Sequence, residues 1–255
     1  MSLAPVWFIS HGAPDLVLRE QPATRFLRTL CLGELKGLVV ISAHWFSREL
    51  QINVEPKPEL MYDFYGFPEP LYRMRWPASS PEWLLQGVSD QLALAGLTAT
   101  PVRRELDHGV WSPLSLIDPN SEIPLVQVSI PASFTPAQLW QLGEVLGALR
   151  SQGIGILASG AITHNLRALA PEGSPVPEWA SLFVDWLEQK MADEDRLALL
   201  DYRRLAPGAV ESHPHDDHLR PLFVALGAAD GVAPTRLHES WDGGSLYMGA
   251  YRFGR

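Results

Sequence analysis

Three short apolar runs in this chain of 255 residues each lead into a histidine. The runs are Val6–Ser10 before His11, Leu38–Phe46 around His44, and Ile154–Gly160 before His164. Runs this short, rich in Val, Ile and Leu, are typical of strands that a parallel sheet buries on both faces. Ligands of open α/β folds bind beyond the carboxyl ends of such strands. We therefore expect these three histidines to share one site.

Segments with the apolar spacing of helices alternate with these runs. In Pro177–Ala192, for example, Trp179, Phe183 and Trp186 recur at positions i, i+4 and i+7. Further helices are expected at Ala23–Leu35, Pro81–Gly96, Pro136–Gln152 and Leu219–Gly227, and further strands at Leu50–Glu55, Thr98–Arg103 and Ile123–Ile130, before a closing hairpin over 236–252. Such alternation predicts an α/β fold with a central, mostly parallel or mixed sheet and helices on both faces. No linker, repeat or low-complexity segment divides the sequence, so we expect a single domain over residues 1–255.

The composition limits the partners of the protein. A formal net charge of −9 without a cluster of Lys or Arg disfavours nucleic acids and anionic membranes. No stretch reaches the roughly 18 apolar residues that span a bilayer. The first residues lack the basic and long apolar segments of a secretory signal, which suggests a cytoplasmic protein. Cys31 is the only cysteine, so histidines and carboxylates remain as metal ligands. We expect a small-molecule partner, and the oligomeric state stays open.

The histidines fit metal chemistry. Neutral imidazoles bring no net charge, so three of them leave a divalent ion its full charge and open positions for other ligands. A further cluster, His213, His215 and His218, lies before the expected C-terminal helix, and spacing alone does not decide which of them reaches the site. His108, preceded by Asp107, is a candidate acid–base residue or one that orients a ligand.

Aromatic residues are the candidates for contact with a substrate. The long segment Pro56–Pro81 is rich in proline and aromatic residues, so we expect an ordered, functional loop. Trp45, Phe64 and Phe67 could form the walls of a pocket for a planar molecule, although such residues more often belong to a core. His238 lies inside an expected strand and is predicted to be structural or exposed.

Six blocks of the sequence, in this order along the chain, resemble those of the class III extradiol ring-cleavage dioxygenases, in particular the DOPA 4,5-dioxygenase-like branch. The blocks are Ser10–Pro14, Ser42–Trp45, Asp63–Pro68, Asp107–Trp111, Ala158–Leu166 and His218–Leu222. The resemblance extends nearly from end to end. It implies an enzyme that uses a non-haem metal and O2 to open the ring of a catechol, such as a DOPA-like compound.

The resemblance also implies roles for five histidines. His11, His44 and His218 would bind the metal, with His164 beside it as catalytic base or possible fourth ligand. His108 would lie close by as a donor to bound oxygen. The implied working metal is Fe(II). The wider class binds iron through two histidines and a carboxylate, whereas a histidine stands at the third position here, and three imidazoles also suit Zn(II) in purified protein.

Two other functions stay open at the level of the sequence. A zinc-dependent hydrolase would use His164 to assist a metal-bound water. A non-catalytic binding protein would keep the fold and some of the histidines without turnover. The chain retains every histidine that the resemblance leads us to expect, and this retention favours an enzyme.

Overall fold

The computed structural model of the chain describes residues 3–230 and 232–254. Its centre is a sheet with the strand order β4-β3-β5-β2-β6-β1-β10-β7. The strands are β1 (Val6–Ser10), β2 (Gly37–Ser47), β3 (Gln51–Asn53), β4 (Thr100–Val102), β5 (Leu125–Pro131), β6 (Ile154–Gly160), β7 (Pro234–His238) and β10 (Ala250–Phe253), and β8 (Trp241–Asp242) pairs with β9 (Leu246–Tyr247) in a separate hairpin. The expected strands and closing hairpin are therefore present.

The sheet is mixed, and its central strands are parallel. β5, β2, β6 and β1 run in the same direction, so their carboxyl ends share one edge. β10 pairs antiparallel with β1, and β7 pairs antiparallel with β10. The register places Ser10 beside Gly160, and Ser42 beside Ser159. The three apolar runs thus end side by side, as their shared pattern predicted.

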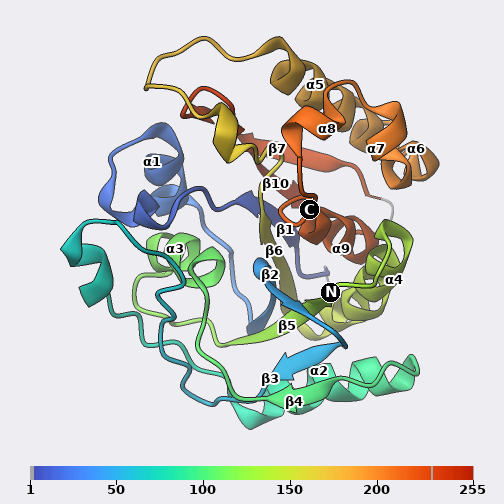
Figure 1. Cartoon of the computed structure of the whole chain (residues 1–255). Helices are drawn as coiled ribbons and strands as arrows, with labels where there is room; N and C mark the ends of the chain where they lie inside the picture. The colour runs from blue at the N-terminus through green and yellow to red at the C-terminus, as the bar shows by residue number, and fades with distance from the viewer. Residues whose placement is uncertain (1–2, 231, 255) are drawn as a thin grey trace.

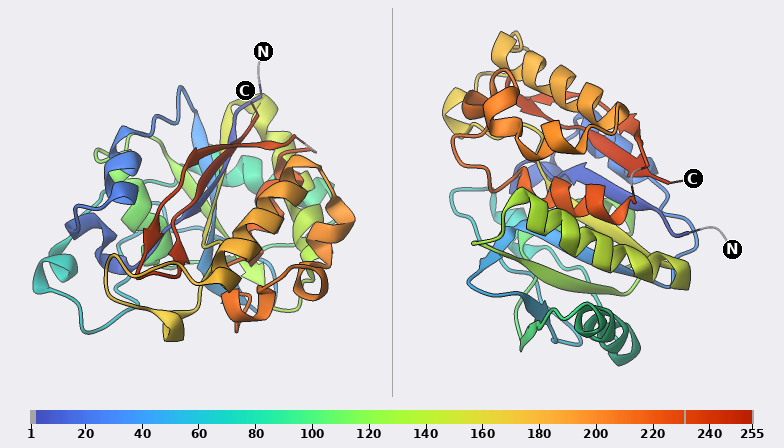
Figure 2. Two further views of the ribbon diagram at one scale, coloured as in Figure 1. Left: turned by 90° about the horizontal axis from the view of Figure 1, so that it is seen from above. Right: turned by 90° about the vertical axis from the view of Figure 1, so that its right-hand side faces the viewer.

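Helices cover both faces of the sheet (Figure 1), which confirms the predicted single-domain α/β fold. α4 (Pro136–Gly147) and α9 (Arg220–Ala228) pack on one face, and α1 (Pro22–Thr29) and α3 (His108–Ile117) on the other. Side chains of β2 alternate between these two layers: Val39 joins the first core and Val40 the second, because successive residues of a strand point to opposite faces. Figure 2 shows the same layers from two further directions.

The remaining elements surround these layers. α2 (Glu82–Leu94) lies near β4 at one end of the sheet, and α5 (Glu178–Ala192) lies near β7 at the other (Figure 1). Shorter elements complete the chain: η1 (Pro14–Leu18), η2 (Glu69–Arg73), η3 (Ala148–Gln152), η4 (Leu166–Ala168), α6 (Arg196–Leu200), α7 (Tyr202–Leu205) and α8 (Ala209–Ser212). Within the described ranges, none of the helices combines the length and apolar character needed to cross a membrane.

Two expected helices differ from the observed ones. The first ends at Thr29, because Leu30 already has an extended backbone, and this leaves Cys31 exposed beyond the helix. The helix expected over Pro136–Gln152 changes into the 3-10 turn η3 after Gly147. Its start is as predicted, since the Thr135 side chain accepts a hydrogen bond from the backbone of Gln138 in a capping box.

Glycines allow α4 and α9 to pack with their backbones in close contact. A Cβ atom at Gly143 would lie 2.1 Å from the carbonyl oxygen of Val224, and one at Gly227 would lie 1.9 Å from that of Trp140. These distances leave no room for a side chain. The contact fixes the position of α9, and His218 lies just before the start of this helix.

Candidate active site

Three imidazoles meet through their Nε2 atoms beyond the carboxyl edge of the sheet. His11 follows β1, His44 lies in the last part of β2, and His218 precedes α9. The Nε2 atom of His44 lies 3.1 Å from that of His11 and 3.2 Å from that of His218. Two nitrogens bound to one ion at about 2.1 Å would lie roughly 3.0–3.4 Å apart. The observed separations therefore match those of ligands to a single metal ion.

The charge state of these side chains also suits a metal. Burial, followed by the neighbouring imidazoles, lowers the pKa of His11 and of His218 well below the usual value. Burial and the nearby His108 lower the pKa of His44 to about 3. All three rings are therefore neutral near pH 7, and a neutral imidazole is the form that binds a metal. The donor set fits a divalent transition-metal ion such as Fe(II) or Zn(II).

Ser159 fixes the orientation of His11. The Ser159 hydroxyl donates a hydrogen bond to the carbonyl oxygen of Gly109, so its oxygen accepts from Nδ1 of His11, at 2.8 Å. With the proton on Nδ1, the Nε2 lone pair of His11 is free and points toward His44. Sequence reasoning did not select Ser159 for this role, because its partners lie 148 and 50 residues away in the chain.

The first turn of α3 packs directly against His44. A Cβ atom at Gly109 would lie 2.5 Å from Oγ of Ser42 and 3.0 Å from Cδ2 of His44, so only glycine fits. Asp107, at the start of this turn, is fully buried and accepts hydrogen bonds from Ser42 and from Gln127. The Ser42 oxygen accepts in turn from the backbone N–H of His44. This turn therefore holds the end of β2 in place.

Asp63 links two of the histidines. Its Oδ1 accepts a hydrogen bond from Nδ1 of His108 at 2.8 Å, and its Oδ2 lies 3.8 Å from Nδ1 of His44. Burial raises the pKa of Asp63, but the hydrogen bond and the proximity of His108 hold it below the usual value. Asp63 is not among the site residues predicted from the sequence, although it opens the aromatic block at Asp63–Pro68.

His164 lies on the other side of His218. The two rings stack with centroids 3.4 Å apart and planes inclined by 8°. Ligand atoms of His164, Asp217 and His218 lie within 4.8 Å of one another, as do those of His11, His44 and His108. The contact between His44 and His218 joins these two groups into one cluster. Burial lowers the pKa of His164, although Asp217 raises it, so the ring of His164 is unprotonated near pH 7.

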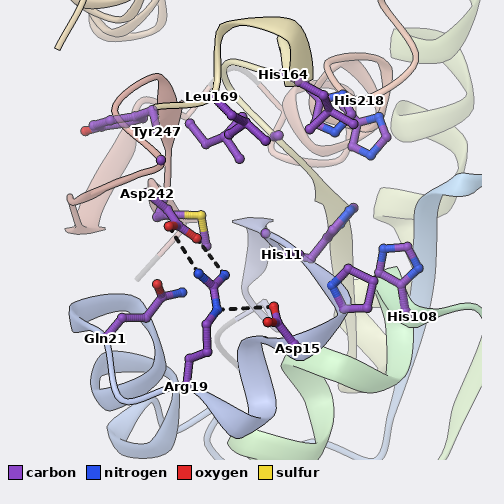
Figure 3. A pocket seen from close by; sticks show the side chains of 18 of the residues that line it. His11, Asp15, Arg19, Gln21, His108, His164, Leu169, His218, Asp242 and Tyr247 are labelled. Atoms are coloured by element: carbon purple, nitrogen blue, oxygen red, sulfur yellow. Dashed lines mark hydrogen bonds and ion pairs between the residues drawn. The ribbon is translucent and has the colours of Figure 1, made fainter. Parts of the chain in front are cut away.

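A cavity of about 860 Å³ opens beside the five histidines. Its lining includes His11, His44, His108, His164 and His218. Figure 3 labels His11, His108, His164 and His218 in this lining. Phe64 and Phe67 also line it, as expected of walls for a planar molecule. Trp45 does not: its ring lies under the guanidinium group of Arg104, with 4.4 Å between that group and the ring centroid. A strand that aims His44 into the cavity aims the next side chain away from it, so the expectation that Trp45 forms a wall of the pocket is wrong.

The remaining histidines lie outside this cavity. His213 is not in a solvated loop but fully buried, and its Nε2 donates to the carbonyl oxygen of Ile162 at 2.7 Å. His215 is exposed and lines a different depression together with Arg203 and Arg220. His238 stacks on Phe26, with 4.8 Å between the ring centroids, in agreement with the expected structural role.

The buried histidines predict a pH-dependent stability of the metal-free protein. Burial lowers the pKa of His213 to about 4, whereas an unfolded chain takes up this proton near pH 6.5. The unfolded state therefore gains protons first as the pH falls, and the free energy of unfolding decreases between about pH 6.5 and 4. Each such histidine changes the free energy of unfolding by at most about 1.4 kcal/mol per pH unit.

Denaturant unfolding at several pH values tests this expectation. His213→Gln, which keeps a donor toward Ile162 and cannot titrate, should reduce the dependence by the contribution of this one group, whereas His215→Gln in the neighbouring exposed loop should leave it unchanged. Identical slopes for wild type and His213→Gln would contradict the prediction.

Comparisons with known proteins show which proteins this chain is similar to. The family model described as the catalytic LigB subunit of aromatic ring-opening dioxygenase matches residues 21–248. The chain is 34% identical to a 4,5-DOPA dioxygenase extradiol of Beta vulgaris, over 99% of this chain and 97% of the relative. It is also 34% identical to the protein of that name from Escherichia coli (strain K12), over 98% of this chain and 94% of the relative.

A solved structure has a fold similar to that of this chain. The crystal structure of an uncharacterized protein from Escherichia coli K12 matches with a TM-score of 0.83 and 32% sequence identity. The match covers 98% of this chain and 100% of that one. The similarity thus includes the whole sheet and every segment that contributes a histidine to the cavity.

Proposed function

The chain belongs to the family of catalytic LigB subunits of aromatic ring-opening dioxygenases, and on this basis we propose that it is an extradiol dioxygenase that opens the ring of a catechol with O2. The observation that carries the proposal is the convergence of three neutral imidazole nitrogens in the lining of one cavity. A DOPA-like catechol is the proposed substrate, because several relatives are named as 4,5-DOPA dioxygenases.

His11, His44 and His218 are the proposed metal ligands, with His164 as a possible fourth. Their Nε2 separations and their neutral state support this assignment. Fe(II), the proposed working metal, would supply the redox chemistry that lets a catechol react with O2, which redox-inert Zn(II) cannot do. Zn(II) suits the same three imidazoles, so purified protein can carry it without being active in ring opening.

Two further histidines supply acid–base chemistry in this proposal. His164 is a free base near neutral pH, held in place by stacking on His218, and it removes a proton from a catechol hydroxyl. His108 is oriented by Asp63 through Nδ1, which leaves Nε2 for the cavity that His108 lines. Phe64 and Phe67 flank the substrate ring from the aromatic loop.

Anaerobic reconstitution tests the proposal. The metal-free protein is loaded with Fe(II) or Zn(II) under argon and given 4-methylcatechol or DOPA, and O2 is then admitted while its uptake and the yellow ring-opened semialdehyde are followed. We expect product only with Fe(II) and O2 together. His164→Ala should slow turnover about 100-fold or more, as expected for loss of a general base, with metal content unchanged.

The outcomes separate the alternatives. Equal product without O2, or equal activity of the zinc form, would refute the dioxygenase. Ester or amide hydrolysis by the zinc form would favour the hydrolase, which three imidazoles also fit. Binding of catechols to the iron form without any turnover would favour a non-catalytic binding protein. A fully active His164→Ala variant would remove this residue from the mechanism.

A further inference from the structure

The cavity has a charged side away from His164 and His218. Arg19, Asp15 and Asp242 line it together with the five imidazoles, and Figure 3 shows these three side chains gathered on the far side of the open space from His164 and His218. Asp15 and Arg19 belong to the segment around η1, and Asp242 belongs to β8. A substrate bound at the histidines therefore directs its substituent toward charged groups.

Arg19 is already paired with carboxylates of the protein. Its two terminal nitrogens donate to the two oxygens of Asp242, at 3.2 and 2.6 Å, and its Nε lies 3.1 Å from Asp15. These interactions use the bidentate face of the guanidinium group, which is the face that a substrate carboxylate would need. An anionic substituent would have to displace Asp242 before it could bind there.

Carboxylates outnumber cations along the described lining. The negatively charged residues of the lining are Asp15, Glu20, Glu172 and Asp242. Among the lining residues that the structure describes, Arg19 is the only lysine or arginine. The side chains of Asp15 and Asp242 are only 22% and 17% exposed, so water screens them incompletely. Each carboxylate has lone pairs left after its contact with Arg19 and can accept from an ammonium group.

We propose that Asp15, Arg19 and Asp242 select catechols whose substituent carries an ammonium group and reject catechols whose substituent carries only a carboxylate. The inference rests on the proposed ring-opening function and narrows its substrate class. A zwitterionic substituent is compatible with the same end of the cavity, because the side-chain nitrogen of Gln21 is buried there and finds no hydrogen-bond partner among the described residues.

A pair of probes of matched length tests the selection. The ethylamine and the propionate derivatives of catechol differ in the charged group alone, and 4-methylcatechol is the neutral reference. With the Fe(II)-loaded enzyme, we expect kcat/KM for the amine to exceed that for the acid by about tenfold or more, which corresponds to roughly 1.4 kcal/mol. Dissociation constants for the Zn(II)-loaded protein without O2 should show the same order.

Variants show which residues cause the preference. Asp242→Asn removes one charge and frees Arg19, so the ratio of amine to acid should fall at least fivefold. Asp15→Asn should act in the same direction. Glu122→Gln, an exposed site outside the cavity, changes the net charge by the same amount and should leave the ratio unchanged.

An acid that equals or exceeds the amine in wild type, or a ratio that Asp242→Asn does not change, would overturn the inference. In both cases the proposed ring-opening function still holds if the enzyme turns over 4-methylcatechol. If none of the three catechols is opened, the proposed function fails instead, and binding to the zinc form still decides the preference.

Discussion

A protein in which His44 is replaced by alanine is expected to lose metal binding almost completely. The Nε2 atom of His44 contacts those of both His11 and His218, so its removal breaks the cluster at its centre. We expect metal affinity to fall by more than about 100-fold, beyond the roughly 10- to 100-fold typical of residues that only orient ligands. Competition of the protein with a chelator for Zn(II) measures this loss, and ring opening should disappear with it.

Ser159→Ala is expected to weaken metal binding less than His44→Ala does. The variant keeps all five histidines of the cavity but removes the acceptor that holds the proton on Nδ1 of His11. We expect a 10- to 100-fold loss of metal affinity. Ser129→Ala is the matched control, because Ser129 is an equally buried serine of the sheet whose oxygen accepts from Ser47 and Gln51.

Normal metal content in the His44→Ala variant would refute the assignment of His44 as a metal ligand.

Gly143→Ala is expected to destabilise the fold by about 3 kcal/mol or more. The added methyl group would lie 2.1 Å from the carbonyl oxygen of Val224 and 2.8 Å from the backbone nitrogen of Ala228. Both are backbone atoms of α9, which cannot turn aside as a side chain can, so the two helices must separate. Because His218 directly precedes α9, metal affinity should decrease together with stability.

Gly87→Ala in α2 is the matched control for this substitution. A Cβ atom at Gly87 has no neighbour within 4 Å, so alanine is expected to stabilise the helix by about 0.5–1 kcal/mol. Urea unfolding of the metal-free proteins measures both changes. A loss below about 1 kcal/mol for Gly143→Ala would contradict the importance of this helix contact.

Local pattern predicted the sheet and part of the site. Apolar runs that lead into a histidine predicted the position of His11 and His44 at one edge of the sheet, because the carboxyl ends of parallel strands meet there. The choice of His218 over His213 came from the family resemblance. Spacing could not make it, since the burial of His213 depends on a contact with Ile162, 51 residues away.

The features that sequence reasoning missed are long-range contacts or details of strand direction. Asp63 meets His108 across 45 residues, and Arg19 meets Asp242 across 223. No local periodicity signals such pairs. Trp45 does not line the cavity because its neighbour His44 does: adjacent residues of a strand face different sides.

The first turn of α3 makes the proposed metal site a property of the whole fold. Gly109 contacts His44 directly and His11 through Ser159, while the proposed ligands come from segments as far apart as residues 11 and 218. Metal uptake must therefore follow completed folding, and a bound ion opposes global unfolding in proportion to its affinity. Occupancy of the site then reports the intactness of the entire domain.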